Sequence, residues 1–116
     1  MSNLARQIPI APEIRRYGIA IVMATHPDQA LATTATKKYV RYGSSPRGLQ
    51  SLILGAKIRA ILDSRYHVAR EDLQLMAKPV LRHRMILNFE GQAEGVTADE
   101  VIEQILPNIP DSAIAA

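Results

Sequence analysis

The sequence predicts a mainly helical domain, a small four-helix bundle with one short pair of strands. Three observations lead to this prediction. The 116 residues, 47% of them hydrophobic, suffice for one core but not for two. Four segments carry apolar residues at the three- and four-residue spacing of a helix face. Each of these segments begins with residues that favour a helix start.

The first helix is predicted from about Pro12 to Thr25. Proline suits the first turn, and Glu13 complements the positive end of the helix dipole. One face of this helix carries Ile14, Tyr17, Ile21, Val22 and Thr25. Residues 19–24 also fit a buried strand by periodicity alone, but a helix explains the whole segment better.

A predicted loop and strand follow. Residues 26–38 contain His-Pro-Asp and then mostly alanine and threonine, so we expect a long loop, either a mobile surface excursion or a segment ordered by a partner. Residues 39–42 alternate aromatic or β-branched with basic residues, which predicts a short strand. Residues 85–89 are its predicted partner.

The second helix is predicted to begin with Ser45 as N-cap and Pro46 in its first turn, and to end at residues 63–66. It carries two apolar stripes, so we expect it to be central. The stripes are Leu49, Leu52, Ile53, Ala56, Ala60 and Ile61, and Leu54, Ile58 and Leu62.

The third helix should begin near Ala69 or Arg70, because Glu71 and Asp72 then lie in its first turn. Pro79 interrupts its apolar face. A proline inside a helix costs about 3 kcal/mol, so we expect a kink or two short helices meeting near Lys78.

The fourth helix is predicted from Thr97 to Leu106, where Thr97 and Glu100 form a capping box and Pro107 ends the helix. The domain organisation follows. Residues 1–11 are expected to be a linker or the stump of an upstream domain, residues 12–106 the folded domain, and residues 107–116 a frayed tail.

Composition excludes several functional classes. The chain has no cysteine, and His26, His67 and His83 are too far apart for paired metal ligands, so we expect no metal site. No apolar run approaches the roughly 20 residues that cross a bilayer. A net charge of +3 and 4% aromatic residues make nucleic-acid binding an unfavoured prediction. We expect a cytoplasmic domain.

Arg47 breaks a local rule, because it places a cation in the first turn of a helix, where the dipole is positive. An anion would relieve this conflict, since helix N-termini bind phosphate or carboxylate and a guanidinium adds charge-assisted hydrogen bonds. The alternative is that Arg47 pairs with a nearby carboxylate of the same chain.

Small residues form a second unusual feature of this helix. Gly48, Ser51 and Gly55 share one face, which is either left open for another domain or subunit or only lets the first helix approach closely. Arg82 and Arg84 belong to a basic cluster that faces solvent or an acidic partner, with a neighbouring subunit as one option.

Four motifs together resemble one family. Residues 42–48, Tyr-Gly-Ser-Ser-Pro-Arg-Gly, resemble the sensor-2 segment that opens the central lid helix of MoxR-type AAA+ ATPases. Residues 66–73, 80–84 and 94–97 resemble later parts of the same lid. Ala69 and Arg70 depart from the pattern, where threonine and proline are common, which implies a weaker N-cap.

The resemblance implies that Arg47, with Ser45 and Pro46, is the sensor-2 element, which approaches the γ-phosphate of ATP. It implies ATP and Mg²⁺ as cofactors of a larger parent ATPase and none for the isolated domain. The implied partners are the parent's own core, neighbouring subunits in a hexameric ring and proteins with von Willebrand factor A domains. The implied role is chaperone-like remodelling. The chain has no phosphate-loop motif, so we expect no catalysis by it alone.

Two rival functions remain. One is a helical DNA-binding module, although Glu71 and Asp72 would repel phosphates at the start of its recognition helix. The other is an adaptor that binds proteins through its small-residue face.

Overall fold

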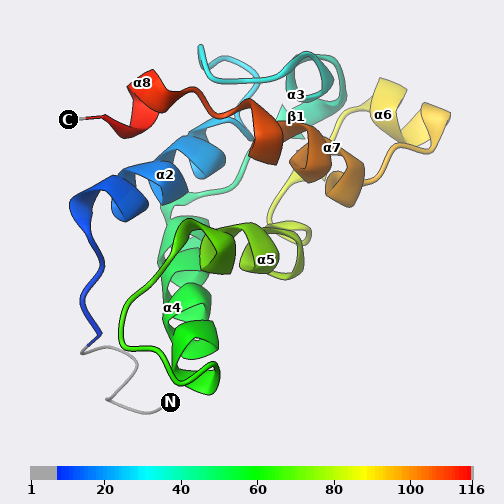
Figure 1. Ribbon diagram of the computed structural model, residues 1–116. Coiled ribbons are helices and arrows are strands. Elements are labelled where there is room, and N and C mark those ends of the chain that lie inside the picture. The colour runs from blue at the N-terminus through cyan, green and yellow to red at the C-terminus, as the bar shows by residue number, and fades with distance from the viewer. Residues whose placement is uncertain (1–7, 116) are drawn as a thin grey trace.

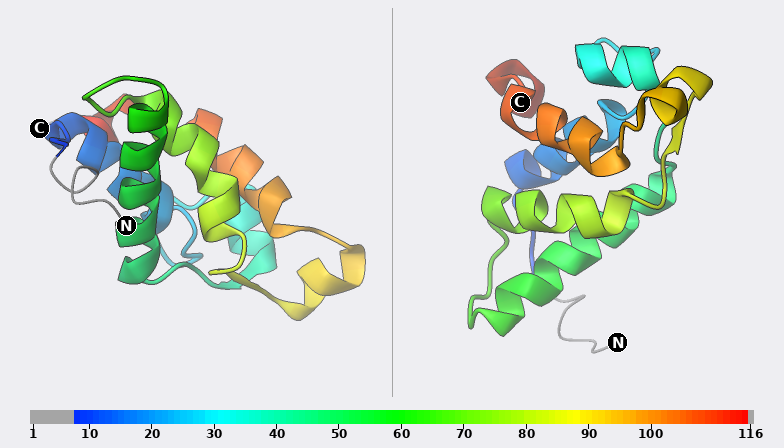
Figure 2. Two further views of the ribbon diagram at one scale, coloured as in Figure 1. Left: turned by 90° about the horizontal axis from the view of Figure 1, so that it is seen from below. Right: turned by 90° about the vertical axis from the view of Figure 1, so that its right-hand side faces the viewer.

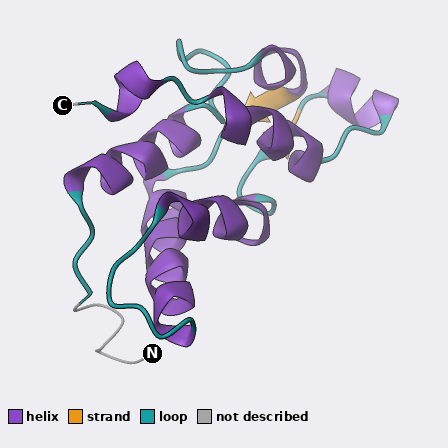
Figure 3. Cartoon of the chain, in the orientation of Figure 1, coloured by secondary structure: helices purple, strands orange, loops and turns teal. Residues whose placement is uncertain are grey.

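The computed structural model describes residues 8–115. These residues form mostly helices, with one small sheet (Figure 1, Figure 3). The mainly helical prediction is therefore confirmed. In chain order the elements are α2 (Pro12–Met23), α3 (Thr34–Tyr39), β1 (Val40–Tyr42), α4 (Pro46–Leu62), α5 (Arg70–Leu81), β2 (Ile86–Leu87), α6 (Phe89–Glu94), α7 (Ala98–Ile105), the 3₁₀ turn η1 (Leu106–Asn108) and α8 (Asp111–Ile114).

The helices pack in two groups. The long helices α4 and α5 lie side by side, and α2 packs against both of them (Figure 2). The shorter α3 contacts α6 and α7, and α7 also contacts α5, which joins the two groups. The resulting core is aliphatic, as the composition predicts. Its largest fully buried apolar side chains are Ile21, Leu52, Leu73, Leu81, Val101, Ile102 and Ile105.

The second predicted helix is only partly central. Its first stripe is mostly buried, with Leu52 and Ala56 fully so. Its second stripe stays partly open, since Leu54 and Ile58 are half-buried and Leu62 is 82% exposed. Within residues 8–115, α4 is therefore covered on one side by α2 and α5 and uncovered on the other.

The prediction of a loop over residues 26–38 is wrong for its last residues, because α3 begins at Thr34. The Thr33 hydroxyl oxygen accepts the Thr36 backbone N–H at 3.2 Å and caps this helix. Thr36 itself is fully buried. Threonine has a low intrinsic helix propensity, so only the tertiary burial of Thr36 makes this short helix stable.

The predicted strand pair is confirmed. β1 and β2 run antiparallel, with Val40 opposite Leu87, Tyr42 opposite Ile86 and a bulge between the two pairs. The predicted second strand is shorter than expected, because Asn88 ends it. The Asn88 side-chain oxygen accepts the Gly91 backbone N–H at 2.8 Å and starts α6.

Pro79 does not divide α5 into two helices, so that part of the prediction is wrong. The helix continues through Lys78 and Pro79 to Leu81. The proline lies in the last turn, where losing one backbone bond leaves little helix beyond it to destabilise.

The fourth predicted helix is confirmed as α7. The Thr97 hydroxyl oxygen accepts the Glu100 backbone N–H at 3.2 Å, as the capping box predicts. The expected fraying after it is wrong for residues 107–115. The tail forms η1 and α8, and Ile114 is 4% exposed against α2.

Part of the predicted linker also packs on the fold. Ile8 is buried in the core. The rest of this prediction, residues 1–7, lies outside the described residues.

A buried ion pair closes the connection between α4 and α5. The Asp72 carboxylate is fully buried and accepts bonds from both terminal nitrogens of Arg65, at 2.6 and 2.9 Å. It also accepts the Ala69 backbone N–H at 2.8 Å, which is the half of a capping box that does not need a side-chain acceptor at Ala69. The Arg65 guanidinium holds the pKa of Asp72 below its usual range.

We predict that Asp72→Asn destabilises the chain by about 3 kcal/mol at pH 7, because it removes one partner of a buried pair. Urea denaturation measures this, with the exposed neighbour Glu71→Gln as the control. The pKa of Asp72 is lowered by folding, so its contribution is present above about pH 3.9 and disappears as pH falls through the folded-state pKa. A difference between wild type and Asp72→Asn that stays constant down to about pH 2 would contradict this assignment.

Candidate functional site

The loop before α4 is fixed to the end of α2. The buried Ser44 donates its backbone N–H to the Thr25 hydroxyl oxygen at 2.9 Å, and that hydroxyl donates to the Val22 carbonyl at 2.5 Å. The Ser44 carbonyl oxygen lies 2.7 Å from Nε2 of His26. These contacts hold both backbone groups of Ser44, so the chain enters α4 from one defined point.

Gly43 is required for this contact. A Cβ atom at Gly43 would lie 2.6 Å from the Thr25 carbonyl oxygen, which belongs to the backbone and cannot rotate away. Only glycine lets the two backbone segments come this close.

Ser45 and Pro46 begin the helix as predicted, with one difference. Ser45 has the extended N-cap conformation and Pro46 occupies the first helical position, both of them exposed. The Ser45 carbonyl accepts the Gly48 backbone N–H at 2.9 Å, whereas its side chain makes no cap hydrogen bond. The serine hydroxyl is therefore not used for the cap.

Arg47 follows in the first turn of α4. It is exposed, and within residues 8–115 it forms no ion pair with a carboxylate. The alternative was that Arg47 pairs with a carboxylate of the same chain. The described residues contain no such pair. A free guanidinium beside a helix N-terminus is a chemical arrangement suited to a phosphate or a carboxylate ligand.

The small-residue face is covered by α5, so the expectation that it is left open is wrong for the two glycines. A Cβ at Gly48 would lie 1.8 Å from the Ser44 hydroxyl oxygen and 3.3 Å from Cδ2 of Leu81. A Cβ at Gly55 would lie 2.9 Å from Cε of Met76. The covering helix is the third predicted helix and not, as the alternative had it, the first.

The two arginines of the basic cluster differ in their partners. Arg82 forms a two-bond ion pair with Asp99 of α7, at 3.0 and 3.1 Å, so it is engaged within this chain. Arg84 donates from Nη2 to the Ser51 hydroxyl oxygen at 3.1 Å. This hydrogen bond joins the turn after α5 to α4. Arg84 remains exposed.

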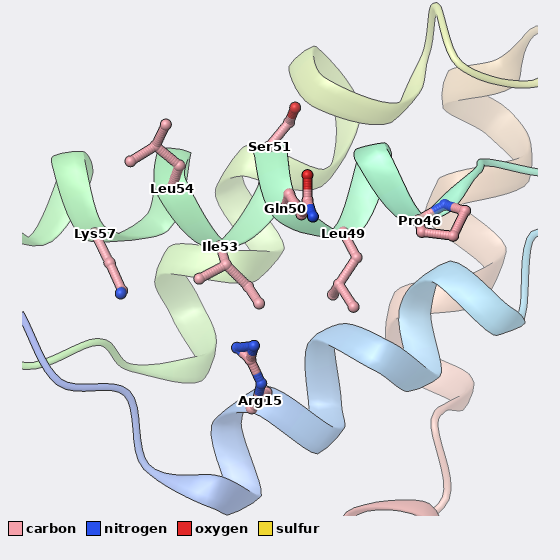
Figure 4. A pocket seen from close by; sticks show the side chains of 8 residues that line it. All are labelled: Arg15, Pro46, Leu49, Gln50, Ser51, Ile53, Leu54 and Lys57. Carbon is pink, nitrogen blue, oxygen red and sulfur yellow. The ribbon is translucent and has the colours of Figure 1, made fainter. Parts of the chain in front are cut away.

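A groove of about 730 Å³ runs along α4, with Arg15 of α2 on its opposite side (Figure 4). Arg15 points into it from α2, and Lys57 lies on the α4 side at its other end. The groove begins at Pro46, next to Arg47. Its remaining lining residues are Leu49, Gln50, Ser51, Ile53 and Leu54.

The sequence analysis missed the residues that support Arg47. The sequence pattern places Thr25 only on one face of the first helix and excludes His26 only as a metal ligand. Their partner Ser44 lies about 20 positions away, so no local spacing indicates the contact. The short Gly-Ser-Ser-Pro run before Arg47 was the only local sign that this loop is constrained.

The described residues offer neither a metal site nor a membrane-spanning helix. Residues 8–115 contain no group of three or more histidines, cysteines or acids placed to hold a metal. No helix in this range combines the length and the apolar character needed to cross a membrane.

A small helical bundle with an exposed arginine at the start of its longest helix has the form of an AAA+ lid. The family described as "AAA lid domain" matches residues 32–105. The chain belongs to this family, and the resemblance noted in its motifs is confirmed.

Most of the chain is similar to MoxR proteins. It is 29% identical over 93 residues to Chaperone MoxR1 of Mycobacterium tuberculosis, covering 80% of this chain and 25% of that protein. It is 32% identical over 106 residues to Protein MoxR of Paracoccus denitrificans, covering 86% and 31%. The crystal structure of a candidate ATPase from Cytophaga hutchinsonii superimposes with a TM-score of 0.87 at 33% identity, covering 93% and 33%. The chain thus spans a quarter to a third of these proteins.

We predict that Gly55→Leu destabilises the chain by about 1–3 kcal/mol, because the new side chain must displace Met76 and Val80 of α5. Urea denaturation of the chain measures this, with helicity checked by circular dichroism. The matched control is Gln50→Leu, an exposed position on the same helix. Equal stability of the two variants would show that α5 does not press on Gly55.

Proposed function

We propose that this domain is the sensor-2 lid of a MoxR-type AAA+ ATPase, in which Arg47 contacts the phosphates of ATP bound between the lid and the ATPase core. One observation carries the proposal. Arg47 is an exposed guanidinium without an ion pair in residues 8–115, held in the first turn of α4 by an anchored loop. The match to the lid family supports it.

The residues present fit a nucleotide phosphate. The first turn of α4 offers the positive end of the helix dipole, and the Arg47 guanidinium adds a permanent charge with several N–H donors. When bound, ATP supplies the phosphoryl group that is transferred to water, and Arg47 stabilises charge on its oxygens. Residues 8–115 hold no cluster of acids for Mg²⁺, so we assign the Mg²⁺ ligands to the ATPase core.

The support around Arg47 gives the lid its coupling role. The loop before α4 is bonded to the end of α2, and the glycine face of α4 is packed against α5. A movement of Arg47 toward or away from a phosphate therefore moves these three helices together. In this way the nucleotide state sets the position of the lid.

The names of the relatives support a proposal for the role of the whole protein. One of them is named a chaperone, and MoxR is the name of others. We propose that the parent ATPase is cytoplasmic and assembles as a hexameric ring, and that the lid contacts its own core and a neighbouring subunit. The work of the ring is chaperone-like remodelling of partner complexes, with von Willebrand factor A domain proteins as partners.

We predict that Arg47→Ala in the parent ATPase lowers ATP turnover about a hundredfold, the effect expected when one group that stabilises transferred phosphoryl charge is removed. In the 116-residue chain the same change should leave stability equal or slightly raised, because a cation leaves the helix N-terminus. Arg41→Ala, an exposed arginine of β1, is the control. If thermal melting of the chain instead falls by several degrees, Arg47 has a structural role and the assignment fails.

A further inference from the structure

Arg84 is bonded to α4 about one helical turn after Arg47, although the two arginines are far apart in sequence. Ser51 follows Arg47 by four positions in α4, so the two side chains leave the same face about 5–6 Å apart. The Arg84 guanidinium donates to the Ser51 hydroxyl oxygen at 3.1 Å. Its contact with α4 therefore lies about one helical turn after Arg47.

This placement is built into the packing of α4 on α5. The end of α5 lies against the start of α4 (Figure 2, right). The approach is so close that a Cβ at Gly48 would lie 3.3 Å from Cδ2 of Leu81. After Leu81 the chain turns, and the Arg84 backbone N–H donates to the Leu81 carbonyl at 2.9 Å. Met85 is then buried, so the turn is held on both sides of Arg84.

The charges around this pair are unbalanced. In the described part of the chain, neither Arg47 nor Arg84 has an ion-pair partner. Four other cations there do have one, since Arg59 and Arg65 pair with Asp72, Lys78 with Glu103 and Arg82 with Asp99, whereas others, such as Arg41 and Lys57, have none either. Arg47 and Arg84 are both attached to the first turns of α4, one by its own backbone and one through Ser51, and an anion that binds both offsets the repulsion between their like charges.

We propose that Arg84 is a second phosphate-binding arginine, which together with Arg47 holds the phosphate chain of a nucleoside triphosphate, with Ser51 as the positioning residue for Arg84. This inference rests on the proposed function and extends its site. A phosphate chain carries several charged oxygens on neighbouring groups, so two guanidiniums from different elements can each bind their own oxygens. A single carboxylate offers only two oxygens at one point.

The test is an NMR titration of the 116-residue chain with inorganic tripolyphosphate. We expect weak, salt-sensitive binding that perturbs the signals of residues 47, 51 and 84. Arg84→Gln and Arg47→Gln should each weaken binding about fivefold, as expected for the loss of one exposed ion pair. Ser51→Ala should give a smaller loss, because it frees Arg84 without removing its charge. The matched control is Arg82→Gln, which leaves the affinity unchanged.

The outcomes separate the two proposals. If Arg84→Gln binds like the wild type while Arg47→Gln is weakened, the second arginine is refuted and the sensor-2 assignment stands. If tripolyphosphate does not bind, or if neither variant is weakened, the second arginine is refuted, and the sensor-2 assignment is decided by the turnover of the Arg47→Ala parent ATPase. Binding of the dicarboxylate glutarate as tight as that of tripolyphosphate would overturn the phosphate assignment in favour of an acidic side chain. The dispersion of the amide signals verifies that each variant is folded.

Discussion

The hydrogen bond from the Ser44 backbone N–H to the Thr25 hydroxyl is the contact on which the candidate site depends. It joins the end of α2 to the start of α4, and Gly43 makes it possible by lying against the Thr25 carbonyl. A buried backbone group without a partner would cost about 1–3 kcal/mol, so this contact defines one geometry for the loop. The position of Arg47 is set by the geometry of this loop.

The opposite end of α4 is fixed by different chemistry. Asp72 gathers Arg65 and the Ala69 backbone N–H into one buried network, which ties the connection between the two long helices. Between the two ends, glycines let α5 lie close to α4. As a result, α2, α4 and α5 form one unit in which both ends of α4 are held by hydrogen bonds. Such a unit suits a lid that must report on a ligand at one end by moving as a whole.

Local signals in the sequence predicted the parts of the fold that local chemistry determines. The starts of α4 and α7 follow from a proline and from a threonine cap, and both were predicted. The helix at residues 34–39 and the packed tail were missed, because their stability comes from burial of Thr36 and Ile114 by distant segments. Family resemblance proposes Arg47 as a site residue but does not indicate the contacts that hold its loop. The contacts between Thr25 and Ser44 and between Ser51 and Arg84 span 19 and 33 positions, beyond the reach of any spacing rule.

A double-mutant cycle of Thr25→Val and Arg47→Ala, read as ATP turnover by the parent ATPase, tests the central claim most directly. Valine keeps the shape of threonine but cannot accept the Ser44 N–H. If Thr25 acts by placing Arg47, Thr25→Val lowers turnover in the presence of Arg47 and has almost no further effect in the Arg47→Ala protein. Fully additive losses of activation free energy would contradict the account, because they would mean that the anchored loop and the arginine act independently.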